Sequence, residues 1–317
     1  PDRDPPLSPP LARALGERLA DLHVASASRG ALLEAAVDAL GVVWSFGHAG
    51  LASEGLMNSV GSFLAQVGAI LDAGASSSTP PLASAHRPLD GHGLDEEPRM
   101  VMDLSDVIVV HKPAGWACDT SRGDMSEEHS QLLDYMQAVF PPRRSPVLTD
   151  GHHRHGLLHR LDVPGAGLIL AAKTHAAYYR LQLQLAGGAL LRDYAVLCHG
   201  WLPPARSEIR APVYQTLGAR SLPGGVEQQG RAALTLPKVL LHALAAQAAF
   251  TLVAIRIRTG RRHQIRVHTS HLGHPPACDG KYTSRPTLIS DRLWCLHNFV
   301  YRHYLSFLDA SGARREA

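Results

Sequence analysis

The sequence predicts an α+β fold, in which a mixed, mostly antiparallel sheet with flanking helices surrounds a cleft and follows a small all-helical region. Three observations predict it. Leucine and alanine recur at helical spacing near the N-terminus. Strand and helix patterns then mix without the strict alternation that marks parallel α/β proteins. Finally, a dense basic block, 258–268, begins where a strand pattern ends and runs into a helical one.

Length and composition set the limits of this fold. The chain has 317 residues, 45% of them hydrophobic, enough for one large domain or two ordinary ones. It has no run of about 18 apolar residues and no visible secretory signal, so we expect no membrane span and a cytoplasmic or organellar protein (mitochondrion or plastid) that is not secreted. The four cysteines lack CxxC spacing, which argues against a zinc ribbon or disulfide framework and favours a reducing compartment.

The net charge of +3 conceals two oppositely charged regions. Residues 1–100 have six arginines and twelve acidic residues, a net charge of −6, whereas the rest has a net charge of +9. A basic domain suits a polyanionic partner. Ordinary surface charge explains the same count equally well. Only four of the 31 basic residues are lysine, and arginine is the better residue for bidentate phosphate contacts.

The N-terminal part is expected to be helical. Helical spacing of leucines covers 11–22 and 32–40, and 41–71 reads as two more helices around Gly50 and Gly55. We therefore expect a helical extension over 1–74. Serine, proline and glycine without periodicity predict a linker over 75–98. The second domain is expected over 99–311, followed by a C-terminal tail, 312–317.

The second domain opens with a buried-strand pattern, Val107–Val110, and a Lys112–Gly115 turn. Further strands are expected at 167–172, 194–197 and 250–258, and residues 203–245 show no clear pattern. Thr174 is a plausible N-cap for a helix that ends before Gly187. A last helix is expected from about 262 to 272, with Gly273 after it.

Asp162 and the basic block are the candidate chemical groups. Apolar residues on both sides place Asp162 at the mouth of a buried core, although an aspartate beside Pro164 and Gly165 is more often a turn cap. In the predicted helix, Arg262 and Arg266 share one face. An arginine facing a partly buried aspartate lowers the pKa of that carboxyl, and a nucleophilic aspartate must be ionised. A solvated basic face or a structural ion pair is the alternative.

Several collinear motifs resemble the RluA-type pseudouridine synthases, which convert uridine to pseudouridine in ribosomal and transfer RNA. The resemblance covers roughly residues 106–304. It rests on segments that match motifs of the family and that occur in the same order along the chain. These segments are Val109–Gly115, His159–Asp162 with Gly167-Leu168, Ala172–Thr174, Tyr194, Arg258–His268, Gly273–Pro275, Asp279–Tyr282 and Leu296-His297. The resemblance implies a pseudouridine synthase catalytic domain with a cleft, an RNA substrate (rRNA or tRNA), base flipping and no cofactor.

The resemblance also implies roles for individual residues. Asp162 corresponds to the catalytic aspartate and Arg266 to the arginine that pairs with it. Tyr194 corresponds to the tyrosine that packs on the target base and is a candidate for removing the C5 proton. Arg160 matches the arginine implicated in filling the space of the flipped nucleotide, and Leu296 corresponds to a hydrophobic wall of the pocket.

Other members of the basic block are expected to bind substrate: Arg262, His263, Gln264 and His268. The chain departs from the family after Asp162, where Pro164–Gly167 replaces the usual Thr-Ser-Gly. The lost hydroxyls keep open a second hypothesis, that the protein is a catalytically silent RNA-binding or ribosome-associated protein on the same fold.

Nineteen histidines offer a third hypothesis, a metal hydrolase. His268 and His271 share a helix face, so a metal site is conceivable there. However, the chain has no HExxH motif and no cysteine joins these histidines. We therefore expect no metal site, and a monomer that binds RNA and no membrane.

Overall fold

A computed structural model describes residues 27–75, 96–118, 131–215, 223–245 and 248–317. Its helices are α2 (Arg29–His48), α3 (Glu54–Ala75), α4 (Leu132–Val139), η2 (Pro146–Thr149), η3 (Gly151–Gly156), α5 (His175–Ala186), α6 (Gln264–His271) and α7 (Arg285–Asp291). Its strands are β1 (Arg99–Asp103), β2 (Val107–Lys112), β3 (Ala166–Ala172), β4 (Leu191–His199), β5 (Ile209–Arg210), β6 (Val213–Tyr214), β7 (Gly225–Val226), β8 (Leu234–Ala245), β9 (Ala248–Ile257), β10 (Val300–Leu308) and β11 (Arg314–Glu316).

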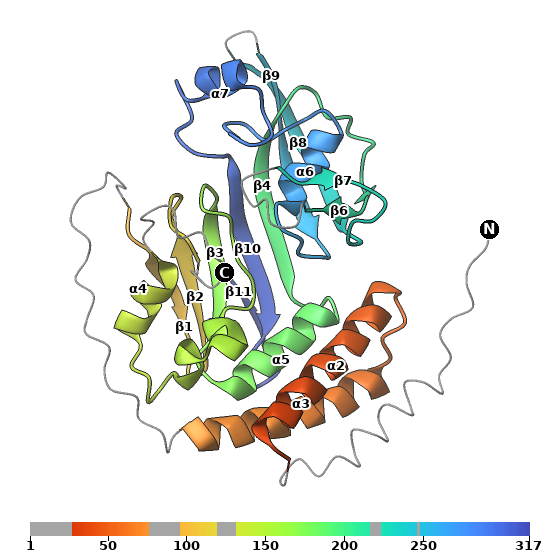
Figure 1. The fold of residues 1–317 in the computed structure, drawn as a ribbon. Coiled ribbons are helices and arrows are strands. Elements are labelled where there is room, and N and C mark those ends of the chain that lie inside the picture. The colour runs from red at the N-terminus through yellow and green to blue at the C-terminus, as the bar shows by residue number, and fades with distance from the viewer. Residues whose placement is uncertain (1–26, 76–95, 119–130, 216–222, 246–247) are drawn as a thin grey trace.

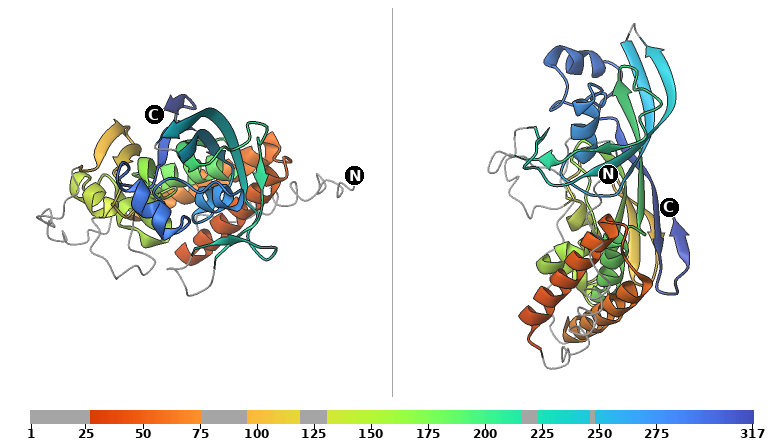
Figure 2. Two further views of the ribbon diagram at one scale, coloured as in Figure 1. Left: turned by 90° about the horizontal axis from the view of Figure 1, so that it is seen from above. Right: turned by 90° about the vertical axis from the view of Figure 1, so that its right-hand side faces the viewer.

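One long sheet organises the molecule (Figure 1). Its order is β1-β2-β3-β10-β4-β9-β8-β5, with β11 paired to β10, and β6 and β7 form a separate pair. Every pairing in the long sheet is antiparallel except that of β3 with β10. The side view shows α2 and α3 near one end of this sheet and the β8–β9 tip at the other (Figure 2). The predicted mixed, mostly antiparallel sheet is confirmed.

Strand β2 separates two hydrophobic cores because successive side chains of a strand point to opposite faces. Val107 and Val109 pack with α2, α3 and α5. Ile108 and Val110 pack with α4, with the centre of the sheet and with Ile265 of α6. The candidate site forms on this second face, where α6 lies against β8 and β9.

The N-terminal helices are part of the first core rather than a separate body. Gly68 of α3 lies so close to α5 that an added Cβ would be 2.5 Å from the Ala176 Cα. The Arg261 guanidinium lies 5.2 Å from the centre of the Trp44 ring of α2. Among the described residues, only α2 is long and apolar enough to cross a bilayer, and several of its residues are buried against α3 and α5. The absence of a membrane span stays a prediction.

The helix boundaries in this region differ from those expected. Gly41 does not end a helix, because α2 continues through it to His48. An added Cβ at Gly41 would touch nothing, so glycine there is a helix residue on an open face. The helix expected at 11–22 and most of the expected linker lie outside the described residues. Residues 312–317, expected to be a tail, instead include β11, which pairs with β10.

Most of the elements expected in the second domain are present. The predicted strands correspond to β2, β3, β4 and β9, and Thr174 caps α5 by accepting from the Ala177 N–H at 3.1 Å. The last predicted helix is shorter than expected, since α6 begins at Gln264 and not at Arg262. The unpatterned stretch 203–245 supplies β5 to β8.

Candidate active site

Asp162 lies in the irregular segment between η3 and β3, directly after the buried Leu161. Its side chain is 24% exposed, whereas its partner Arg266 on α6 is only 6% exposed. The guanidinium Nη1 donates to Asp162 Oδ2 at 2.9 Å. Oδ1 of Asp162 has no hydrogen-bond partner among the described residues. The pairing predicted from sequence is therefore present, and it leaves one carboxylate oxygen available at a partly open position.

Arg266 is held in place by a second carboxylate. Its Nε and Nη2 each donate to Asp279 at 2.7 Å, in a bidentate pair whose aspartate is fully buried. Asp279 also accepts from the Asn298 side chain at 3.0 Å and from the Lys281 N–H at 3.0 Å. A bidentate pair fixes the plane of the guanidinium, so Nη1 is aimed at Asp162.

The charges of this group favour an ionised Asp162. Burial alone would raise the pKa of Asp162, but the His263 ring when it is protonated, and the permanent charges of Arg266 and Arg160, hold it below its ordinary value. Burial lowers the pKa of His263 to about 4, so that ring is neutral near pH 7. Arg266 is therefore the main cation beside Asp162. Burial works against its charge too, but Asp279 and Asp162 raise the pKa of Arg266, which keeps it protonated.

His263 and Tyr282 lie beside the Asp162–Arg266 pair. His263 has a left-handed φ of 54° and lies just before α6. Its Nε2 is 3.7 Å from Asp162 Oδ2, and its Nδ1 is 3.1 Å from the Tyr282 hydroxyl. The Tyr282 ring lies 5.0 Å from the Arg266 guanidinium carbon. The unusual backbone turn at His263 thus places its ring beside the carboxylate instead of on the helix surface.

Tyr194 is held by an arginine that the sequence analysis missed. Tyr194 lies on β4 and is 3% exposed, and Arg302 on β10 is 1% exposed. The Arg302 Nε donates to the Tyr194 hydroxyl at 3.0 Å, and the guanidinium lies 4.9 Å from the ring centre. The same guanidinium donates to His159 Nδ1 at 2.6 Å and to the Arg160 carbonyl at 3.1 Å. Arg302 therefore joins the tyrosine to the segment that leads to Asp162.

The loop after Asp162 is anchored by a buried lysine. Lys112, at the end of β2, donates to the Gly165 carbonyl at 2.7 Å and to the Trp116 carbonyl at 2.8 Å. Burial lowers the pKa of Lys112 to about 8, against the opposing influence of Cys118 and Asp162. Its partners in the loop are backbone carbonyls, so the loop keeps this anchor without the hydroxyls that the family usually has there.

Two residues expected to bind substrate are instead engaged inside the protein. Gln264 donates to the Leu234 carbonyl at 3.1 Å and accepts from the Thr259 hydroxyl at 2.7 Å. His268 is fully buried, with Nδ1 at 2.9 Å from the Thr235 hydroxyl and Nε2 at 2.9 Å from a backbone carbonyl. An RNA contact by either would break one of these bonds. His268 is also unavailable as the metal ligand of the hydrolase hypothesis.

The other expected binding residues lie nearer the surface. The Arg160 side chain is exposed, directly before Leu161 and Asp162. Arg262 precedes α6, so it does not share a helix face with Arg266 as expected. Leu296 is 78% exposed, in the segment between α7 and β10 that contains Asn298. Their contacts with RNA stay predictions.

Asp279, Asn298 and Arg302 are among the site residues for which the sequence predicted no role. Asp279 lay within a recognised motif, and its position in a short polar run after buried residues was the available signal. Arg302 gave none, because an arginine among tyrosine and histidine reads as a solvated strand face. Together the group offers an ionised carboxylate, a fixed guanidinium and a buried tyrosine at one end of α6.

Comparisons with known proteins find similar sequences over more than half of the chain. The family described as RNA pseudouridylate synthase matches residues 106–271. An uncharacterised RNA pseudouridine synthase of Bacillus subtilis is 32% identical over 183 residues, covering 58% of this chain and 57% of that protein. The ribosomal large subunit pseudouridine synthase D of Yersinia pestis is 30% identical over 188 residues, with 59% and 53% covered. The chain thus spans a little over half the length of these relatives.

A solved structure supports the fold. The human RNA pseudouridylate synthase domain containing 1 superposes with a TM-score of 0.54 at 24% identity. The alignment covers 72% of this chain and 84% of that one. Asp162, Tyr194 and Arg266 lie inside the region that the family matches, whereas Asp279 and Arg302 lie beyond it.

Proposed function

The chain belongs to the RNA pseudouridylate synthase family, and from this premise we propose that it isomerises specific uridines of an RNA to pseudouridine. The observation that supports the proposal is the Asp162–Arg266 pair. It combines a hydrogen bond of 2.9 Å, a carboxylate 24% exposed and a fixed guanidinium behind it. An aspartate that acts on the uridine must be ionised when substrate arrives, and this arrangement favours that state.

The reaction breaks the N1–C1′ bond of uridine, turns the uracil and joins its C5 to C1′. The proton lost from C5 is balanced by one gained at N1, so the change is an isomerisation that consumes no oxidant or reductant. Attack by the carboxylate at C6 of the base and its participation at C1′ of the sugar both require ionised Asp162. Tyr194 is the proposed contact for the base, and its hydroxyl is oriented by Arg302.

RNA binding is expected to use exposed arginines near the site. A uridine within a helix must leave the stack to reach Asp162, at a cost of a few kcal/mol. Phosphate contacts offset such a cost. Arg160, exposed and directly before the Leu161–Asp162 turn, is the best placed side chain for the space that a flipped nucleotide leaves.

The catalytically silent alternative loses its supporting observation. It depended on the altered loop after Asp162, yet Lys112 anchors this loop through backbone carbonyls. Asp162 and Arg266 are hydrogen-bonded to each other, and Tyr194 is held by Arg302, which supports the proposed catalytic roles. We therefore favour the enzyme. A ribosomal RNA substrate is supported by the name of the Yersinia relative, transfer RNA is the second candidate, and we propose a monomer in the cytoplasm or an organelle.

The test is pseudouridine mapping at single-base resolution in RNA from cells with and without this protein. Sites that disappear should return with the wild-type chain and stay absent with Asp162→Asn, because an amide cannot act as a nucleophile. Asp134→Asn is the matched control, since Asp134 is exposed on α4. It should restore every site. RNA binding by Asp162→Asn should remain largely intact, and restoration of the sites by this variant would show that Asp162 is not the catalytic carboxylate.

A further inference from the structure

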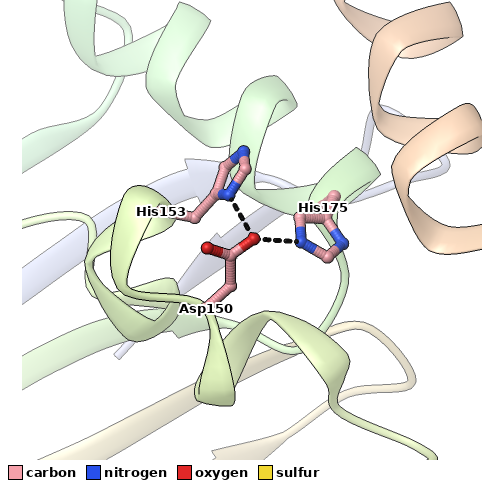
Figure 3. Close-up of side chains that lie close together, drawn as sticks. All are labelled: Asp150, His153 and His175. Atoms are coloured by element: carbon pink, nitrogen blue, oxygen red, sulfur yellow. Dashed lines mark hydrogen bonds and ion pairs between the residues drawn. The ribbon is translucent and has the colours of Figure 1, made fainter. Parts of the chain in front are cut away.

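A second polar cluster lies away from Asp162, where η3 meets the first turn of α5. Asp150, His153 and His175 present one carboxylate oxygen and two ring nitrogens, all within 4.8 Å of one another (Figure 3). Asp150 Oδ2 is 2.8 Å from His153 Nδ1 and 3.0 Å from His175 Nε2. Both histidine side chains are 2% exposed and that of Asp150 is 9% exposed.

One oxygen of Asp150 has more partners than an ionised carboxylate oxygen ordinarily accepts. Arg29 of α2 also donates to Oδ2, at 2.7 Å, whereas among the described residues Oδ1 accepts only the His152 N–H, at 2.9 Å. A carboxylate oxygen offers about two acceptor positions. Three groups that converge on one oxygen, two of them imidazole nitrogens, indicate a place where a cation fits between the rings and the carboxylate.

The outer nitrogens of both rings have the partners that metal-bound histidines have. His175 Nδ1 is 2.8 Å from Asp72 Oδ1 of α3, and His153 Nε2 is 3.0 Å from the Tyr179 hydroxyl. A ligating histidine usually donates its outer N–H to a carboxylate or another oxygen. The inner nitrogens, His153 Nδ1 and His175 Nε2, both face Asp150 Oδ2, so the two rings and the carboxylate converge on one position.

The negative charge around the cluster also favours a bound cation. Asp72 and Asp150 both contact the His175 ring, and the arginine that pairs with Asp150, Arg29, has a side chain that is 59% exposed. Two imidazoles with one carboxylate are ligands that suit Zn²⁺ and not Mg²⁺ or Ca²⁺. We propose that Asp150, His153 and His175 bind a zinc ion, with water as a fourth ligand.

Such a site would join separate elements of the fold. Its ligands come from the N-cap of η3, from η3 itself and from α5, and the outer partner Asp72 comes from α3, where it also accepts the His175 N–H at 2.8 Å and the Ala176 N–H at 3.1 Å. Zinc would therefore strengthen the attachment of the N-terminal helices to the body that contains Asp162. Metal that binds only the folded state adds its binding free energy to stability.

The experiment measures zinc in the full-length chain purified without a polyhistidine tag. After incubation with zinc and dialysis, we expect about one zinc ion per chain and a melting temperature that a chelator lowers. Cobalt should give the visible absorption of a bound ion, and magnesium should change nothing. His153→Ala and His175→Ala should each lose the metal and the chelator effect.

His152→Ala is the matched control, because its exposed ring lies in the same tract and only its backbone N–H contacts Asp150. It should keep the metal. The wild-type protein alone can overturn the proposal, even if the variants do not fold. A wild-type chain that retains no zinc or cobalt, with a melting temperature unmoved by metal or chelator, would show that the cluster is held by its hydrogen bonds alone and is not a metal site. Equal loss of metal from His152→Ala would also contradict it.

Discussion

Two buried arginines hold the two proposed catalytic side chains, and they do so by different means. Arg266 contacts Asp162 and Asp279, so its charge is balanced by two carboxylates. Arg302 contacts the Tyr194 hydroxyl, the His159 ring and backbone carbonyls, and no carboxylate among the described residues. The charge of Arg266 is therefore neutralised by carboxylates, whereas the charge of Arg302 is stabilised by the dipoles of a hydroxyl, a ring and carbonyl groups.

The difference suits the two tasks. Asp162 must keep a negative charge, and a permanent cation beside it achieves this. Tyr194 must keep its position, and a guanidinium with several donors in one plane can fix a hydroxyl, a ring and a neighbouring carbonyl together. Replacement of Arg266 and replacement of Arg302 should therefore differ in their effects on stability and on activity.

Arg266→Ala should have the largest effect. It leaves Asp279 fully buried without its cation, and breaking a buried pair in this way costs about 3–5 kcal/mol of the free energy of unfolding. Activity should be lost with it. Chemical denaturation measures the first effect and pseudouridine formation the second. Arg256→Ala is the control, because Arg256 makes the same bidentate contact with Asp193 at the surface. Arg256→Ala should lower the free energy of unfolding by less than about 1 kcal/mol. If the two variants lost equal amounts of stability, burial of the Arg266–Asp279 pair would not be the cause of the larger loss.

The buried histidine beside Asp162 should give the pair a pH dependence. Burial lowers the pKa of His263 to about 4 from an ordinary 6.5, so between these values the unfolded chain binds a proton that the folded chain does not. Stability should therefore fall as the pH drops from 6.5 to 4, by roughly 3 kcal/mol from this residue. His263→Asn, which tolerates the left-handed φ, should lose that part of the slope. An unchanged slope would mean that other groups cause the acid sensitivity.

Arg302→Met should destabilise less than Arg266→Ala. It leaves hydroxyl and carbonyl groups unpaired but no buried ion, for which we expect about 2 kcal/mol. Activity should fall because Tyr194 and the segment before Asp162 lose their common partner. Arg302→Lys, which keeps the charge without the planar donors, should not restore activity. A loss of stability as large as that of Arg266→Ala would erase the distinction between the two arginines.

Tyr194→Phe should have the smallest effect on folding, about 1.5 kcal/mol, because it keeps the ring and removes only the hydroxyl that accepts hydrogen bonds from Nε and Nη2 of Arg302. Its effect on turnover should be much larger if the hydroxyl takes the C5 proton. Single-turnover kinetics on an RNA oligonucleotide separates the two, since binding should persist. If this variant turned over at the wild-type rate, the hydroxyl would have no role in proton removal, and Tyr194 would act only by packing its ring.

The sequence was most informative where local pattern and chemistry coincide. Apolar and polar residues alternate clearly in the strand before the basic block, so β9 was predicted. Thr174 and Gly187 mark the two ends of α5, so this helix was predicted as well. The residues alone made a pair of Asp162 and Arg266 conceivable, and the resemblance to the family selected these two residues. The start of the helix was not predicted, because the left-handed residue His263 precedes α6 and leaves Arg262 outside it.

The missed parts depend on contacts between distant residues. Strand β10 contains Arg302, His303 and Tyr304, whose polarity conceals that its arginine is fully buried. His175 lies 25 positions after Asp150, and only the packing of α5 on η3 brings them together. Gln264 and His268 are in the recognised motif for reasons of internal bonding, which spacing alone does not distinguish from binding.

Strand β10 lies between β3 and β4 in the sheet, although both of these precede it by more than a hundred residues. During synthesis, β3 and β4 leave the ribosome long before the strand that separates them. The centre of the sheet must therefore stay open until residues 300–308 have emerged, and contacts of such long range form slowly. The proposed site is therefore complete only after β10 has been made: a chain that stops before β10 contains Asp162 and Arg266 but lacks Arg302, the residue that holds Tyr194.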